Sequence, residues 1–181
     1  MTLWMVRHAQ PLVGAGICYG QLDVKADVRA TQTCAQALAN ILPPDITVVT
    51  SPLQRCEQLS QALHAERPDL RFEKNAQLQE MNFGAWENRP WADIARAELD
   101  AWTADFANYK PGDNGESVTA FMTRVACAFD ASPHDCDSVW ITHAGVIRAS
   151  RLIARGLRRL TSADQWPLEA PAYGQWTKLK L

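Results

Sequence analysis

Three short apolar runs along the chain each end abruptly at polar residues, and each is followed by a segment with helical periodicity. The runs are 3–6, 46–49 and 138–142. Short runs rich in apolar, aromatic and β-branched residues are typical of buried strands. Strands of this kind that alternate with helices predict an α/β fold, here a three-layer α/β/α sandwich with a mainly parallel central sheet.

The remaining elements follow from periodicity and from helix-stopping residues. We expect helices over 26–42, 53–65, 91–107, 117–131 and 146–154, and further extended segments at 70–73 and 173–181. Pro43-Pro44 stops the first helix, because proline cannot donate the helical hydrogen bond. A chain of 181 residues fits a single domain spanning 1–181. Within it, we expect a helical excursion over about 80–131 that covers the active site.

Composition excludes several classes of partner. The net charge of −2 argues against a nucleic acid or an anionic membrane, since both select basic surfaces. No apolar run approaches the length of a signal-peptide core or a membrane span, so we expect a cytoplasmic protein. The five cysteines form an odd set without a Cys-x-x-Cys pair, which favours free thiols over a zinc site or disulfides. We expect no metal and no cofactor, and a monomer or a homodimer.

The polar residues that end the three strands carry the chemistry. Ligands of open α/β sheets bind beyond the carboxyl ends of the strands. That edge would gather Arg7 and His8 from the first strand, Arg55 from one turn beyond the second, and His143 from the third. A fourth segment, 78–87, adds a carboxyl group.

These residue types suit phosphoryl transfer to and from a small phosphorylated metabolite. A phosphate monoester carries roughly −1.5 to −2 charges at neutral pH, and arginine offers a planar fork that matches its oxygens. A neutral imidazole can attack phosphorus and form a covalent intermediate, while neighbouring arginines keep it neutral. A second histidine donates to the phosphoryl oxygens, and a carboxylic acid protonates the leaving group. Arginines and histidines supply the positive charge, so the chemistry requires no metal.

Five segments then resemble, in order, the motifs of the histidine phosphatase (phosphoglycerate mutase-like) superfamily. They are Val-Arg-His-Ala-Gln at 6–10, Ser-Pro-Leu-Gln-Arg-Cys-Glu-Gln at 51–58, 78–87 with its Phe-Gly-Ala-Trp-Glu, Gly-Glu-Ser at 115–117, and Thr-His-Ala-Gly-Val-Ile-Arg at 142–148. The resemblance implies that His8 is the nucleophile and Glu80 the proton donor. It also implies a phosphate pocket, made of Arg7, Arg55, His143 and Ala144. Glu87, which is nearby in the sequence, is a competing candidate for the proton donor.

Within the family, the chain looks most like the α-ribazole phosphatase branch. The similarity rests on Ile-Cys-Tyr-Gly at 17–20 followed by Leu22-Asp23, and on the modest chain length. It implies removal of the 5′-phosphate from α-ribazole phosphate in the assembly of the cobalamin nucleotide loop.

Four residues are candidates for substrate contact, namely Gln10, Tyr19, Gly20 and Trp86. Tyr19 and Trp86 serve equally well as packing residues. The chain departs from the family signature at Ala9, where the family has Gly, and at Gln10, where it usually has Glu.

Alternative functions remain open on the sequence alone. A sugar-phosphate phosphatase of broad range uses the same residues, and a non-catalytic family member would bind a phosphorylated ligand without turnover. Mutases of the family are longer, and phosphohistidine protein phosphatases are usually shorter, so both fit less well. Neither His64, late in a polar helix, nor His134, in a Ser-Pro-His-Asp turn, fits a catalytic site, and we expect both to be solvated.

Overall fold

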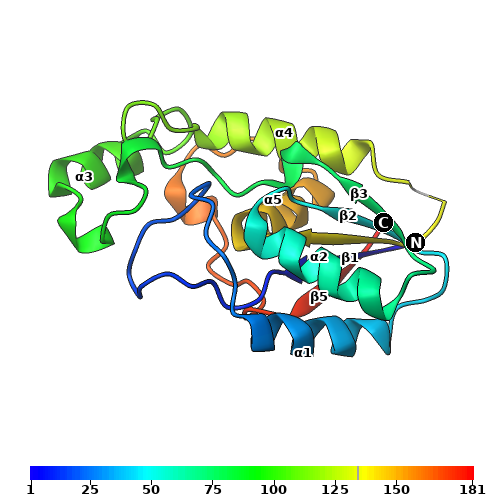
Figure 1. The fold of residues 1–181 in the computed structure, drawn as a ribbon. Helices are drawn as coiled ribbons and strands as arrows, with labels where there is room; N and C mark the ends of the chain where they lie inside the picture. Colours follow the sequence, from blue (N-terminus) through cyan, green and yellow to red (C-terminus); the bar gives the residue numbers. More distant parts are fainter. Residues whose placement is uncertain (134) are drawn as a thin grey trace.

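The computed structural model describes residues 1–133 and 135–181, which build one five-stranded sheet flanked by helices (Figure 1). The strands are β1 (Thr2–Arg7), β2 (Thr47–Thr50), β3 (Arg71–Lys74), β4 (Ser138–Thr142) and β5 (Trp176–Lys180). Their order across the sheet is β3-β2-β4-β1-β5. Only β5, which pairs antiparallel with β1, interrupts the parallel arrangement of this sheet. The predicted fold class is therefore confirmed.

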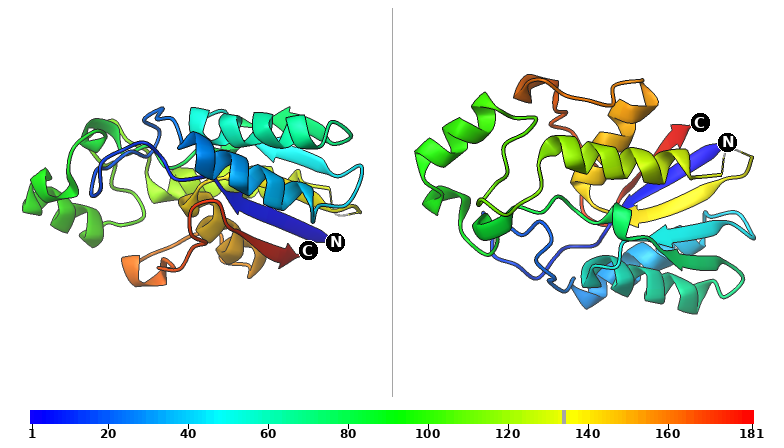
Figure 2. Two further views of the ribbon diagram at one scale, coloured as in Figure 1. Left: turned by 60° about the horizontal axis from the view of Figure 1, so that its bottom comes forward. Right: turned by 90° about the horizontal axis from the view of Figure 1, so that it is seen from above.

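Two helical layers enclose the sheet. The helices are α1 (Val28–Ala39), α2 (Gln54–Glu66), α3 (Arg96–Ala104), α4 (Val118–Asp130) and α5 (Ala144–Ala154), with short 3₁₀ turns at Ala76–Leu78, Gly84–Trp86, Trp91–Asp93 and Ala163–Gln165. Helices α1 and α2 cover one face and α4 and α5 the other, as the two views of Figure 2 show. Helix α3 lies apart from the sheet, beyond the end at which β1 finishes (Figure 1).

Side-chain alternation along the strands builds two cores. On β1, Leu3 and Met5 point to the α4–α5 layer, whereas Trp4 and Val6 point to the α1–α2 layer. All four are buried, with exposed fractions of 5% or less. A strand that is apolar on both faces must be covered on both faces, which explains why the central strands carry no polar alternation.

Several element boundaries differ from those predicted. The first helix begins at Val28 instead of 26, because Ala26 forms an isolated β-bridge with Pro11 and the Asp27 carboxylate caps the helix by accepting from Ala30 N. The helix predicted over 91–107 contains only α3 and a 3₁₀ turn. The chain is extended at Ile94, whose side chain is buried beside Trp86. Helix α5 begins at Ala144, two residues before the predicted start.

The final strand begins at Trp176 instead of 173. Gly174 has a φ of 69°, a left-handed conformation that ends any extended run through Tyr173. Its N–H donates to the carbonyls of Arg7 and His8, so this turn is tied to the end of β1.

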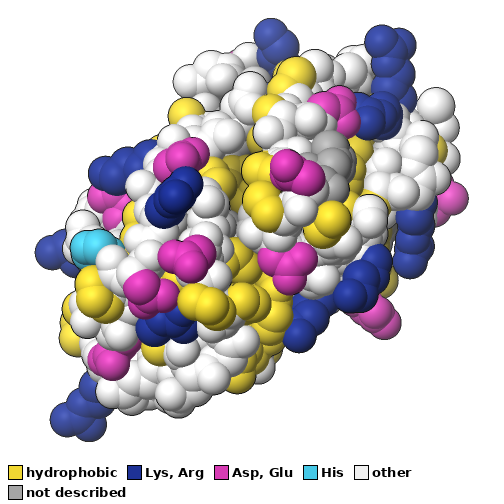
Figure 3. All heavy atoms as spheres, turned by 90° about the vertical axis from the view of Figure 1, so that its right-hand side faces the viewer, with side chains coloured by type: hydrophobic (Ala, Val, Ile, Leu, Met, Phe, Trp, Pro, Cys, Tyr) yellow, Lys and Arg dark blue, Asp and Glu magenta, His cyan; other side chains and the backbone are white. Residues whose placement is uncertain are grey.

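The face of the molecule opposite α3 has no dominant sign of charge. Figure 3 shows basic and acidic side chains interspersed over that face. Among the described residues, no helix combines the length and the apolar character that crossing a membrane requires.

Candidate active site

The strand register brings the two predicted histidines together. Arg7 of β1 is paired with Thr142 of β4, so the residues that follow each strand lie side by side. His8 N donates to the Thr142 carbonyl at 3.0 Å, and the rings of His8 and His143 are 5.2 Å apart between centroids. Both side chains are buried, at 2% and 0% exposed. The predicted meeting of polar groups at the carboxyl edge of the sheet is thus seen in the structure.

The imidazole of His8 is held in one orientation. Its Nδ1 lies 2.7 Å from the backbone carbonyl of Ala9, which only accepts, so Nδ1 carries the proton and Nε2 keeps its lone pair. The pKa of His8 is lowered from 6.5 to about 3. Burial is the largest cause, and the positive charge of Arg55 is the second. An unprotonated ring with a free Nε2 is the nucleophilic form of histidine.

Two guanidinium groups flank His8. Arg55, in the first turn of α2, is fully buried and donates to the carbonyls of Gly20 at 2.6 Å and Leu22 at 2.9 Å. Arg7 donates to the Pro171 carbonyl and lies 3.9 Å above the centre of the Tyr173 ring. Each arginine also has a buried Nε without a hydrogen-bond partner among the described residues. Among the described residues, neither guanidinium forms an ion pair with a carboxylate, so both retain the charge and the donors that a phosphate group binds.

His143 is oriented by a serine that the sequence analysis did not include among the site residues. Ser51 Oγ lies 2.8 Å from His143 Nε2, and the same oxygen accepts from Leu53 N. The other ring nitrogen, Nδ1, is buried and has no partner in the described part of the chain. The pKa of His143 is well below its usual value, mainly because the ring is buried and secondly because Arg55 is positively charged. Ser51 follows β2 directly, which is the signal that would have identified it.

Glu80 lies beside the start of α5. Its Oε2 accepts from Gly145 N at 3.0 Å and its Oε1 from Met81 N at 3.0 Å. A Cβ on residue 145 would stand 2.1 Å from Glu80 Oε1, so only glycine permits this approach. Ala144, between His143 and Gly145, is the first residue of α5, where a backbone N–H has no partner within the helix. Glu87, the competing carboxylate, accepts from the backbone N–H groups of Gln21 and Phe83.

The four candidate substrate contacts have different surroundings. Gln10 is exposed, and its backbone carbonyl accepts from Asp27 N. The Tyr19 hydroxyl lies 2.7 Å from that of Tyr173, a residue the sequence analysis missed. Gly20 packs against the Met81 carbonyl with no room for a Cβ, and its own carbonyl binds Arg55.

Of the two roles that the sequence left open for Trp86, substrate contact and packing, its surroundings favour packing. The side chain is fully buried and forms a core cluster with Cys18 and Ile94. Its indole N–H donates to the Glu98 carboxylate of α3. The ring therefore attaches α3 to the rest of the domain and has no surface left to offer a ligand.

A partly buried ion pair between Arg124 of α4 and Glu116 contacts the segment that carries Glu80. Arg124 donates to both carboxylate oxygens of Glu116, at 2.7 and 2.8 Å, and to the carbonyls of Gln77, Gln79 and Glu80 at 2.7 to 3.0 Å. Both side chains of the pair are less than a fifth exposed. Sequence reasoning noted Glu116 in its Gly-Glu-Ser motif but missed Arg124, which stands two helical turns beyond the motif on a predicted helix.

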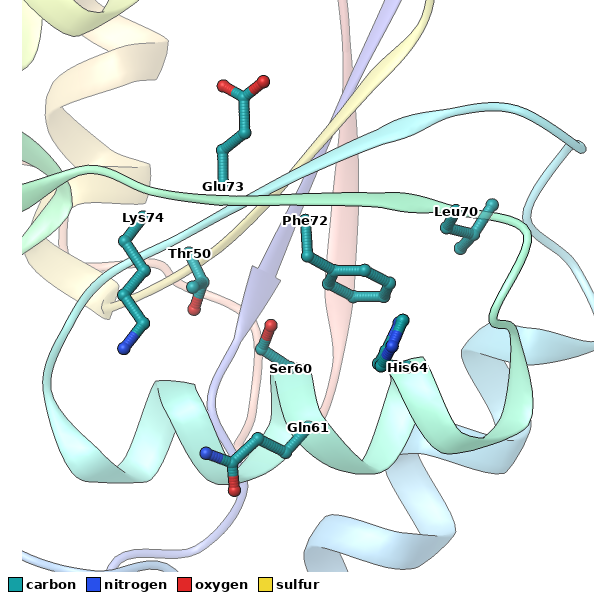
Figure 4. A pocket seen from close by; sticks show the side chains of 8 residues that line it. All are labelled: Thr50, Ser60, Gln61, His64, Leu70, Phe72, Glu73 and Lys74. Carbon is teal, nitrogen blue, oxygen red and sulfur yellow. The ribbon is translucent and has the colours of Figure 1, made fainter.

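A separate groove lies away from these residues. A groove of about 400 Å³ runs between α2 and the edge strand β3, with Phe72 and His64 on its wall (Figure 4). His64 is exposed as predicted and packs its ring edge-on against Phe72. None of the residues that line this groove belongs to the histidine and arginine group, so it is separate from the site. The expectation for His134 lies outside the described residues.

The fold and the site define an α/β protein that presents two histidines and two arginines at the carboxyl edge of a mainly parallel sheet. Residues 3–180 match the profile of the histidine phosphatase superfamily (branch 1). The chain belongs to this family.

Named relatives agree with this assignment. The chain is 31% identical to an adenosylcobalamin/alpha-ribazole phosphatase of Salmonella typhimurium, over all of this chain and 91% of that protein. It is 29% identical to a probable phosphoglycerate mutase of Yersinia pestis, over 72% of this chain and 62% of that protein. A solved mycobacterial glucosyl-3-phosphoglycerate phosphatase is similar with a TM-score of 0.76 and 26% identity, over 98% of this chain and 88% of that one. These relatives support a phosphatase.

The buried, unprotonated state of His8 predicts a pH-dependent stability. In the unfolded chain, His8 takes up a proton below about pH 6.5, whereas the folded protein does not until about pH 3. The free energy of unfolding therefore falls as the pH drops below about 6.5. His8→Gln should reduce that slope by up to about 1.4 kcal/mol per pH unit between about pH 6 and 4.5. Urea unfolding in phosphate-free buffer measures the slope, and identical slopes for the two proteins would contradict the prediction.

The contacts of Arg124 predict that it positions Glu80. Arg124→Lys should slow hydrolysis of an alkyl phosphate by about 10- to 100-fold, a part of the about 10²–10⁴ that a positioned acid contributes. Hydrolysis of 2,4-dinitrophenyl phosphate, whose leaving group needs no proton, should change much less. Arg158→Lys is the matched control, because Arg158 forms an exposed ion pair with Asp130. Equal losses on both substrates would show that Arg124 is merely structural.

Proposed function

We propose that the protein hydrolyses a small phosphomonoester, without a metal, through a phosphohistidine intermediate on His8. The observation that carries this proposal is the environment of His8. A buried ring with a free Nε2 lies beside His143 and close to the charges of Arg7 and Arg55, and these neighbouring groups have buried ring or guanidinium nitrogens without a partner among the described residues. Such a site neutralises a phosphate group and presents a nucleophile to it.

In the first step, His8 Nε2 attacks phosphorus while the bond from phosphorus to the ester oxygen breaks. The phosphoryl oxygens are held by Arg7, Arg55 and the Nδ1 hydrogen of His143, which donate as charge spreads over them in the transition state. The departing alkoxide takes a proton from Glu80, and the alcohol leaves. His8 now carries the phosphoryl group.

In the second step, water attacks the phosphorus of phosphohistidine and the bond from phosphorus to Nε2 breaks. Glu80, now a carboxylate, accepts the proton that the water releases. Inorganic phosphate departs, His8 regains its lone pair, and Glu80 is protonated again for the next cycle. Atoms and protons balance over the two steps without any further reactant.

For the substrate, we propose α-ribazole 5′-phosphate. The resemblance of residues 17–23 to that branch supports it. So does the identity with the Salmonella typhimurium relative, whose match covers all of this chain. The reaction would serve cobalamin biosynthesis. A sugar-phosphate phosphatase of broad range remains the alternative, and the same assay decides between them.

Phosphate release should be measured with EDTA present on α-ribazole 5′-phosphate, 3-phosphoglycerate, fructose bisphosphate and an aryl phosphate. A clear preference for α-ribazole 5′-phosphate supports the substrate assignment. Comparable rates across the panel would retain the mechanism and reject that substrate. No release from any ester would favour a non-catalytic binder.

His8→Ala should lower phosphate release by at least about a thousandfold, because it removes the group that forms the covalent bond. A radiolabelled phosphoryl group should remain on the parent protein after an alkaline quench and be lost in acid, and the variant should hold none. His64→Ala is the matched control, since His64 is an exposed histidine outside the site. Undiminished release by H8A would refute the covalent mechanism.

A further inference from the structure

A small aromatic cavity adjoins Glu80 on the side away from the sheet. It encloses about 130 Å³, and its lining residues come from the Glu80 segment, α3, α4, α5 and the segment after the last 3₁₀ turn. Its aromatic members are Phe83, Trp102, Phe106, Phe121 and Trp166. Neighbouring rings are in contact, with centroids 5.7 Å apart for Trp102 and Phe106 and 6.2 Å apart for Phe121 and Trp166.

The cavity is not a sealed part of the core. Trp102, Trp166 and Phe83 are only partly buried, whereas Phe106 and Phe121 below them are buried. Two charged residues, Glu80 and Arg148, share the lining with the rings. A carboxyl group and a guanidinium in the lining of an aromatic hollow are typical of a ligand subsite, in which apolar walls give affinity and a few polar groups give orientation.

The position of Glu80 connects the cavity with the proposed chemistry. A residue that protonates the leaving group lies beside the ester oxygen, opposite the attacking His8. The alcohol part of the substrate must therefore extend past Glu80, and Glu80 and Gly145 both line the cavity. Pockets that enclose a whole drug-sized ligand measure about 300–1,000 Å³, so this hollow takes one part of a substrate and not all of it.

We propose that this aromatic cavity is the leaving-group subsite and that it binds a flat, largely apolar ring attached to the alcohol. The inference rests on the proposed function and deepens it. Most of this lining is apolar and offers partners to few sugar hydroxyl groups, which disfavours a purely polar alcohol. A heteroaromatic ring suits the lining better, because it stacks on the aromatic rings and offers an acceptor nitrogen. Two lining residues, Trp102 and Arg148, each have a buried N–H without a partner among the described residues.

The comparison of α-ribazole 5′-phosphate with ribose 5-phosphate tests the subsite. Both esters break the same bond to a ribose C5 oxygen, and they differ by the benzimidazole ring. The ratio of their kcat/KM values should favour the first ester by at least about tenfold, which corresponds to about 1.4 kcal/mol. Trp166→Leu should reduce that ratio at least about fivefold, and Phe106→Leu provides a second variant should the first fail to fold. Phe72→Leu, which removes a ring on the far edge strand, should keep the ratio.

The outcomes separate this inference from the proposed function. Equal kcat/KM values for both esters, or a ratio that Trp166→Leu leaves unchanged, would overturn the subsite while the phosphatase mechanism stands. If neither ester is hydrolysed, the proposed function fails. Binding of unphosphorylated α-ribazole, measured by the change in tryptophan fluorescence, then tests the subsite alone. Saturable binding that Phe106→Leu weakens at least about fivefold would support the subsite, and absence of binding would refute it.

Discussion

The buried positive charge of Arg55 is the constraint on which the rest of the site depends. A fully buried guanidinium that has no carboxylate partner is costly, and two backbone carbonyls of the 20–22 loop offset only part of that cost. Burial lowers the pKa of His8 and of His143, and the Arg55 charge adds to this effect, because each protonated ring would be a second buried cation beside it. In the proposed reaction, an anionic substrate would supply the missing charge. The proposed affinity for phosphate and part of the nucleophilicity of His8 thus both depend on this buried arginine.

Close backbone approaches then determine where Glu80, the proposed proton donor, lies. Gly145 and Gly20 stand where any Cβ would collide with the Glu80 carboxylate or the Met81 carbonyl. Because both neighbours lack a side chain, the segment around Glu80 settles against the first loop and the start of α5. Arg124 holds the other side of that segment through three carbonyls. The position of Glu80 is therefore set by residues that never touch a phosphate.

Much of the sheet and its site follows from sequence alone, because strand ends and parallel topology are local and general rules. Apolar runs that stop at Arg7, Ser51 and His143 indicate both the strands and the edge at which they meet. Long-range contacts explain the features that the sequence did not predict. The bridge of Ala26 with Pro11 makes the first helix start later than predicted, and the burial of Ile94 interrupts the helix predicted over 91–107. The packing of Trp86 and the reach of Arg124 likewise depend on partners far along the chain, which periodicity cannot reveal.

The departures from the family signature leave the proposed phosphate-binding groups in place. Outside glycine, only Asp45, Asn88 and Asp113 of the described residues have a positive φ, so Ala9 occupies ordinary backbone and its methyl group causes no strain. Its carbonyl still orients His8, and Gln10 is exposed at the loop surface. Because the groups proposed to bind phosphate remain in place, we expect differences between this chain and other members of its family to concentrate on the proposed leaving-group side. There the chain presents aromatic rings next to Glu80, and in the proposed mechanism these rings would decide the selectivity for the leaving group.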